Sequence, residues 1–160
     1  MITIITGDIN SGKTTKMIEL FKSFGGDGFV SLKNMVGTEV VGFDYLHLST
    51  NTVGPLATKT NSLPYRHTLG PYYFIEEGLA FIEKSVRQSV SEEKTPLYLD
   101  EIGKLEIEKK GFYPMIIWMF QNMKYSSSIY FTVRRVYVNQ IIELFNIQEF
   151  EIIDLGERRF

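Results

Sequence analysis

One short stretch near the N-terminus carries the residue types that bind a polyphosphate. It matches the pattern G-x-x-x-x-G-K-[ST] at every fixed position, which chance produces in well under about 1% of chains of this length. Lys13 can reach the β- and γ-phosphates of a nucleotide, and the hydroxyl of Thr14 suits Mg²⁺. We therefore expect Mg²⁺ and a nucleoside triphosphate such as ATP or GTP to bind here. The stretch reads Gly7-Asp8-Ile9-Asn10-Ser11-Gly12-Lys13-Thr14, and Thr15 follows as a further nucleotide-binding candidate.

The glycines and the following helix explain why this pattern suits phosphate. Glycine lets the loop fold tightly, so that successive amide groups point inward and form an anion-binding nest. The first amides of a helix have no partner within that helix, and its dipole favours negative charge there. The alternative interpretation is a glycine-rich turn between a strand and a helix that binds nothing.

Two adjacent carboxylates supply the second half of a hydrolytic site. Asp100 and Glu101 follow the apolar run Leu97–Leu99, and ligands of open α/β sheets sit at the carboxyl ends of strands. Consecutive strand residues point to opposite faces, so the two acids can take different roles. We expect Asp100 to hold Mg²⁺ with Thr14, and Glu101 to orient or deprotonate water. An acidic turn after a buried strand is the alternative.

Periodicity predicts the elements that position these residues. Ile2–Thr6 is short and β-branched, and Lys13–Phe24 has apolar residues at helical spacing. The alternation of strands and helices predicts an α/β fold. We expect one domain over residues 1–160, with a mostly parallel sheet and an antiparallel section within Phe29–Ile75. Other expected strands are Phe29–Leu32, Val40–Leu48, Tyr72–Ile75, Pro96–Leu99, Ser128–Val133 and Phe150–Leu155; helices are Glu76–Val90, Phe112–Met123 and Val138–Phe145; Thr50–Thr68 is expected to be a long loop.

Composition excludes several classes of protein. The net charge of −2 offers no basic footprint, so we expect no nucleic-acid partner. The absence of cysteine excludes disulfides, cysteine-based zinc sites and thiol catalysis, and it fits the cytoplasm. No apolar stretch approaches the roughly 20 residues of a membrane span, and the N-terminus does not read as a signal peptide.

The segment after the acids is similar to a known signature. Asp100-Glu101-Ile102-Gly103-Lys104-Leu105-Glu106 resembles the D-E-I-G-K-M-E motif of the THEP-type nucleoside-triphosphatases. Further segments resemble that family in the same order, up to about Val133, although the arginines usual between its two G-F segments are missing from Asn34–Val40. These segments are Gly28-Phe29, Val41–Asp44, Gly54–Ala57, and Arg66 with Gly70–Phe74.

This resemblance implies a fold and an activity. It implies a three-layer P-loop NTPase fold of the RecA-like (ASCE) kind, with Mg²⁺-dependent hydrolysis of nucleoside triphosphates to the diphosphate and phosphate. It also implies nucleotide contacts over Leu97–Lys104, which include Gly103 and Lys104. Base selectivity is expected to be loose.

The sequence leaves open the roles of two arginines and two alternative functions. Arg66 is a candidate to stabilise the charge of the transition state, although it also fits a solvated loop residue. Arg134 follows a predicted strand and fits either a phosphate contact or the surface. A phosphotransferase could close Thr50–Thr68 over an acceptor. A non-enzymatic, nucleotide-responsive module could bind a partner, not identified by the sequence, through the apolar residues near Trp118.

Overall fold

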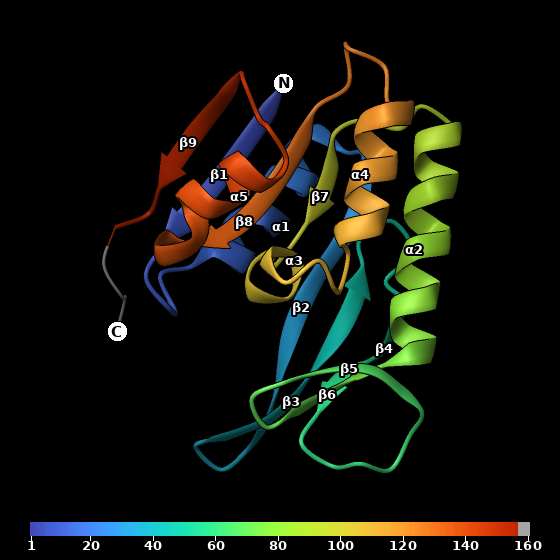
Figure 1. Cartoon of the computed structure of the whole chain (residues 1–160), viewed down its shortest axis with the longest axis vertical. Helices are drawn as coiled ribbons and strands as arrows, with labels where there is room; N and C mark the ends of the chain where they lie inside the picture. The colour runs from blue at the N-terminus through green and yellow to red at the C-terminus, as the bar shows by residue number, and fades with distance from the viewer. Residues whose placement is uncertain (157–160) are drawn as a thin grey trace.

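The chain folds around one mixed sheet with helices on both faces (Figure 1). The structure is a computed structural model, and it describes residues 1–156. The sheet has nine strands in the order β5-β6-β4-β3-β2-β7-β8-β1-β9. Their bounds are β1 Ile2–Gly7, β2 Asp27–Val36, β3 Glu39–His47, β4 Val53–Thr58, β5 Tyr65–Leu69, β6 Tyr72–Ile75, β7 Leu97–Leu99, β8 Ile129–Arg134 and β9 Phe150–Asp154.

The half of the sheet from β2 to β9 is parallel, and it carries the phosphate-binding motif. Its central strands are short and buried, as expected for strands covered by helices on both faces. The sheet has a hydrophobic core on each face, and successive residues of β1 point into different cores. Ile4 packs with α2, α4 and α5, whereas Ile5 packs with α1. The result is the predicted three-layer arrangement. The helices are α1 Lys13–Phe24, α2 Glu76–Ser91, α3 Lys104–Ile107, α4 Tyr113–Asn122 and α5 Val138–Leu144, with a 3₁₀ turn at Arg135–Tyr137.

The other half of the sheet is antiparallel, as the sequence predicted. Strand β2 joins the halves, because Asp27–Phe29 pairs with β7 while its continuation pairs with β3. The prediction of a long loop over Thr50–Thr68 was wrong, since β4 lies within this range and β5 begins in it. Gly54 and Pro55 weaken the strand signal of β4. Pairing with β3 and β6, which the local sequence does not reveal, stabilises this strand.

The predicted helices are present, and α1 has the predicted bounds. The strand expected at Phe29–Leu32 is longer at both ends, and the four-residue helix α3 was missed because it is too short for a periodic pattern. Across residues 1–156, no helix has both the length and the apolar character needed to cross a bilayer.

Candidate active site

The phosphate loop connects β1 to α1, and its backbone requires glycine. Asn10 and Gly12 have φ angles of 62° and 96°, so both adopt the left-handed region with Ser11 between them. Such alternation turns neighbouring amides toward a common side and forms an anion-binding nest. A Cβ atom on Gly7 would lie 2.4 Å from the Ser11 hydroxyl oxygen, so a side chain does not fit there. The loop therefore has the tight geometry inferred from its sequence.

Helix α1 adds free donors and a cation to this loop. The amides of Lys13, Thr14 and Thr15 donate to no acceptor within residues 1–156, and Gly12 provides no side-chain cap. The buried Lys13 ammonium donates to the carbonyl oxygen of Asp8 at 2.9 Å. Burial lowers the pKa of Lys13, while the nearby carboxylates of Glu101 and Asp100 oppose that shift. The loop thus concentrates positive charge and unpaired donors at one place.

Asp100 lies directly against the phosphate loop. It follows β7, which is two strands from β1 in the sheet. The Thr14 hydroxyl donates to Asp100 Oδ2 at 2.8 Å, and the backbone amide of Ser31 donates to the same oxygen at 2.9 Å. Burial raises the pKa of Asp100, and the hydrogen bonds from Thr132, Ser31 and Thr14 counteract this rise. The two motifs that are 86 residues apart in sequence therefore meet through one hydrogen bond.

Thr132 of β8 holds both acids, and the sequence reasoning did not single it out. Its side chain is fully buried. Its hydroxyl donates a short hydrogen bond to Asp100 Oδ1 and accepts one from the Glu101 amide at 2.7 Å. Strand β8 lies beside β7 in parallel register, which brings Thr132 level with the acids. The available signal was a single threonine within the largely apolar strand Ile129–Val133.

Glu101 projects from a strained backbone position. Its φ angle is 59°, which is uncommon for a residue with a side chain and recurs at functional sites. Desolvation by surrounding protein atoms, followed by the charge of Asp100, raises the pKa of Glu101; Arg134 and Lys13 oppose the shift. A carboxylate with a raised pKa is a better proton acceptor near neutral pH. The backbone position and the raised pKa together suit Glu101 to accept a proton.

Glu106 fixes the turn that follows the acids. It is buried, and its two carboxylate oxygens accept from the amides of Gly103 at 2.8 Å and Phe112 at 3.0 Å. Desolvation raises the pKa of Glu106 to about 7. A Cβ atom on Gly111 would lie 2.3 Å from Glu106 Oε2, so the turn closes tightly on this side chain. The same turn positions the exposed Lys104 near Glu101 at the edge of the site.

Comparison with known proteins identifies the family. A family model described as NTPase matches residues 2–158. The chain belongs to this NTPase family. A nucleoside-triphosphatase THEP1 from Natranaerobius thermophilus is 31% identical over 123 residues, which cover 74% of this chain and 68% of that protein. The THEP1 of Thermotoga maritima is 27% identical over 161 residues, which cover 99% and 88%.

Solved structures confirm the NTPase-family fold. The crystal structure of THEP1 from the hyperthermophile Aquifex aeolicus matches with a TM-score of 0.69 at 19% identity, and the match covers 98% of this chain and 90% of that one. The solution structure of a human cancer-related nucleoside triphosphatase matches with a TM-score of 0.68 at 24% identity, with coverage of 95% and 87%. The predicted α/β P-loop architecture is therefore correct.

The residues of this NTPase-family chain fit a magnesium ion. Mg²⁺ prefers oxygen ligands, keeps several waters and is usually held by one or two protein groups plus substrate phosphates. The Thr14 hydroxyl and the Asp100 carboxylate already touch beside the phosphate loop, and both are hard oxygen donors. Within residues 1–156, no cluster of three or more His, Cys, Asp or Glu side chains forms a separate metal site. These donors therefore suit a Mg²⁺ ion that is held jointly by the protein and by the phosphates of a bound nucleotide.

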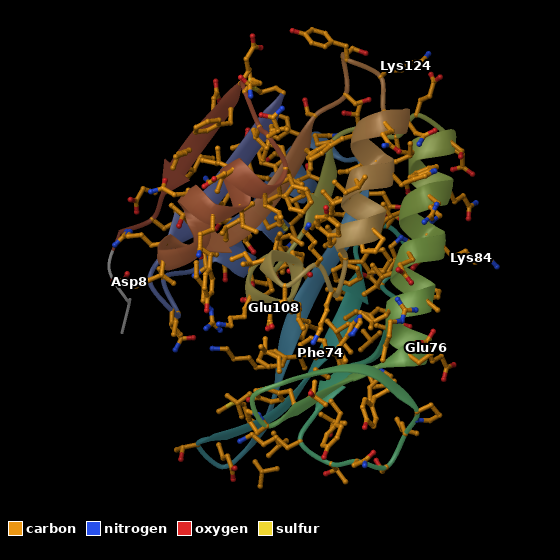
Figure 2. The ribbon with its side chains drawn as sticks, in the orientation of Figure 1. Asp8, Phe74, Glu76, Lys84, Glu108 and Lys124 are labelled. Carbon is orange, nitrogen blue, oxygen red and sulfur yellow. The ribbon has the colours of Figure 1, made fainter. Side chains whose placement is uncertain are left out.

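Arg66 does not join the other candidates. Its guanidinium donates to Glu76 at 2.7 and 2.8 Å and to Glu83 at 2.8 Å, so it joins β5 to α2. Glu76 begins α2 in Figure 2, at the end of the molecule that carries β5 and β6. These carboxylates raise the pKa of Arg66 further above its ordinary value. The structure therefore gives Arg66 a role in packing, and its expected catalytic role finds no geometric support.

Arg134 is the arginine that lies beside the same cavity as the acids. It ends β8, the strand that also carries Thr132, and it lines a cavity of about 560 Å³ together with Glu101. Its charge acts on both Lys13 and Glu101. Within residues 1–156 no carboxylate forms an ion pair with it. The neighbouring Arg135 instead pairs with Asp8 and Asp154.

Proposed function

We propose that this protein hydrolyses nucleoside triphosphates such as ATP and GTP to the diphosphate and phosphate, with Mg²⁺ as cofactor. The supporting observation is the contact between Thr14 and Asp100, which joins a complete phosphate loop to an acidic strand end. Membership of the NTPase family and the names of the relatives support the same activity. The absence of cysteine supports a cytoplasmic location.

Binding and charge neutralisation come from the phosphate loop. The free amides at the start of α1 and the ammonium of Lys13 would bind the β- and γ-phosphates. Thr14 and Asp100 would hold Mg²⁺, which when bound neutralises phosphate charge. Thr132 keeps Asp100 in place, and Ser31 supplies a second donor to it.

Glu101 and Arg134 act on the side of the γ-phosphate. The Glu101 carboxylate would accept a proton from the attacking water, and its raised pKa suits this role. Water attacks the γ-phosphorus in line with the leaving diphosphate, and the transferring group carries dispersed negative charge. Arg134, which has no carboxylate partner among the described residues, would stabilise that charge.

Phosphate release from ATP, GTP, CTP and UTP, each with and without Mg²⁺, tests the proposal. We expect Mg²⁺-dependent release that Lys13→Ala abolishes. Glu101→Gln should bind nucleotide normally, yet turn over about 10²–10⁴-fold more slowly because the proton acceptor is lost. Glu108→Gln is the matched control, because Glu108 is exposed on the same segment and does not line the cavity. Wild-type turnover by Glu101→Gln would rule out the assigned role.

A further inference from the structure

The cavity beside the acids is larger and more apolar than attack by water requires. Its volume of about 560 Å³ lies within the roughly 300–1,000 Å³ range of small-molecule sites. Leu56 and Ala57 of β4 form part of one wall, with Phe74 of β6 and Leu79 of α2. In Figure 2, Phe74 lies in the region between α3 and the antiparallel strands. This apolar wall favours contact with the apolar part of a ligand, while charged side chains such as Lys33, Lys104 and Glu106 also line the cavity.

The polar end of this cavity coincides with the assigned γ-phosphate position, so the inference rests on the proposed function. Asp100, Glu101 and Arg134 line it together with Ile9 and Asn10 of the phosphate loop, whereas Lys13 and Thr14 do not. A nucleotide held by the loop points its γ-phosphate toward the acids and Mg²⁺, and its base lies at the opposite end of the polyphosphate. The cavity is therefore located beyond the γ-phosphate, where a second reactant would lie.

Aromatic side chains define the shape of the ligand. Phe43 and Tyr72 meet edge to face at 5.4 Å between ring centroids, and both line the cavity. An aromatic ring of a ligand can make favourable offset or edge-to-face contacts with these two rings. Two further aromatic residues line the cavity. Phe112 directly precedes α4, and Tyr137 lies in the 3₁₀ turn that follows β8.

We propose that this cavity binds a small aromatic alcohol and that the protein transfers the γ-phosphoryl group to its hydroxyl. The ring would occupy the apolar part, and the hydroxyl would face Glu101. The alcohol oxygen forms a bond to the γ-phosphorus, while the bond from that phosphorus to the β–γ bridging oxygen breaks. The hydroxyl proton goes to Glu101, and the nucleoside diphosphate leaves with the bridging electron pair. The products are a phosphate monoester and the diphosphate.

Product partitioning measures this transfer directly. The protein is incubated with ATP, Mg²⁺ and benzyl alcohol or 2-phenylethanol, and phosphate ester and free phosphate are quantified by ³¹P NMR. If the alcohol has no binding site, the ratio of ester to free phosphate should equal the molar ratio of alcohol to water. We expect an ester-to-phosphate ratio at least about tenfold above that molar ratio, because a bound acceptor reacts at a high effective concentration.

Variants that fill the cavity provide the decisive comparison. Ala57→Phe places a ring inside the cavity, and Ala80→Phe makes the same change at an exposed position of α2 that does not line it. Ala57→Phe should return the ratio to the molar value while hydrolysis without alcohol stays within about twofold, and Ala80→Phe should change neither. Val40→Trp, at a half-buried position of the lining, repeats the test if Ala57→Phe does not fold.

The outcomes separate the two proposals. Phosphate release without excess ester in the wild type overturns the transfer proposal and leaves hydrolysis intact. Excess ester that persists in both cavity-filling variants also overturns it, because the acceptor would then bind elsewhere. If neither ester nor phosphate forms, the hydrolytic function itself fails together with the transfer.

Discussion

Replacing Thr132 by valine should show that activity depends on the orientation of the two acids and not only on their presence. The change keeps the volume of the side chain but removes a hydroxyl that donates to Asp100 and accepts from the Glu101 amide. Thr132 is fully buried, so water does not replace the lost partner. Both acids would remain in the sequence, and only their orientation would change.

The size of the effect follows from the two lost hydrogen bonds. A hydrogen bond to a charged group contributes about 1.5–3 kcal/mol, and an unpaired buried amide costs about 1–3 kcal/mol. A total near 3 kcal/mol lowers the melting temperature of a protein of this length by roughly 6–12 °C. If about half of this energy acts in the transition state, kcat/KM falls by about 10-fold or more.

The hydrogen bond from Thr132 also lowers the pKa of Asp100. Its removal therefore raises that pKa, so a higher pH is needed to ionise Asp100. Thr132→Val should shift the acid limb of the pH–rate profile to higher pH and raise the Mg²⁺ concentration for half-maximal activity. The assay is phosphate release over a matrix of pH and Mg²⁺ concentrations, with thermal unfolding measured alongside.

Thr132→Ser is the matched control. It keeps the hydroxyl and removes one buried methyl group, at a stability cost of about 1 kcal/mol. We expect it to lose some stability while it retains the wild-type Mg²⁺ requirement and acid limb. If Thr132→Val and Thr132→Ser show the same Mg²⁺ requirement and the same pH profile, the hydroxyl does not position Asp100, and the reasoning is refuted.

Two further predictions concern the arginines and Glu106. Arg134→Ala should lower kcat by at least about 10-fold because the transition-state charge loses its partner, whereas Arg66→Ala should leave kcat unchanged and cost about 1 kcal/mol of stability. In steady-state assays, a wild-type kcat for Arg134→Ala would contradict the role of Arg134, and a reduced kcat for Arg66→Ala would contradict that of Arg66. The raised pKa of Glu106, about 7, means that the folded state binds its proton more tightly than the unfolded state. The free energy of unfolding should therefore fall as pH rises from about 4.5 to 7, by up to about 3 kcal/mol, and Glu106→Gln should remove this slope in urea titrations.

Some features of the site could be predicted because neighbouring residues encode them. The phosphate loop needs glycines at Gly7 and Gly12 and a helix directly after them, and all of these lie within one contiguous stretch. The bounds of α1 were correct for the same reason. Asp100 and Glu101 were identified because an apolar strand ends in two acids, a pattern that is visible locally.

Other features depended on which strands become neighbours. Thr132 acts on Asp100 because β8 lies beside β7, and no local pattern gives that order. The two arginines show the same limit: the sequence favoured Arg66, but the fold pairs it with α2 and brings Arg134 to the cavity. The sequence by itself determined the phosphate loop and the acid pair, because backbone conformation and helix start depend on adjacent residues. Only the tertiary structure decided what surrounds them, because contacts between distant residues follow from strand order and packing.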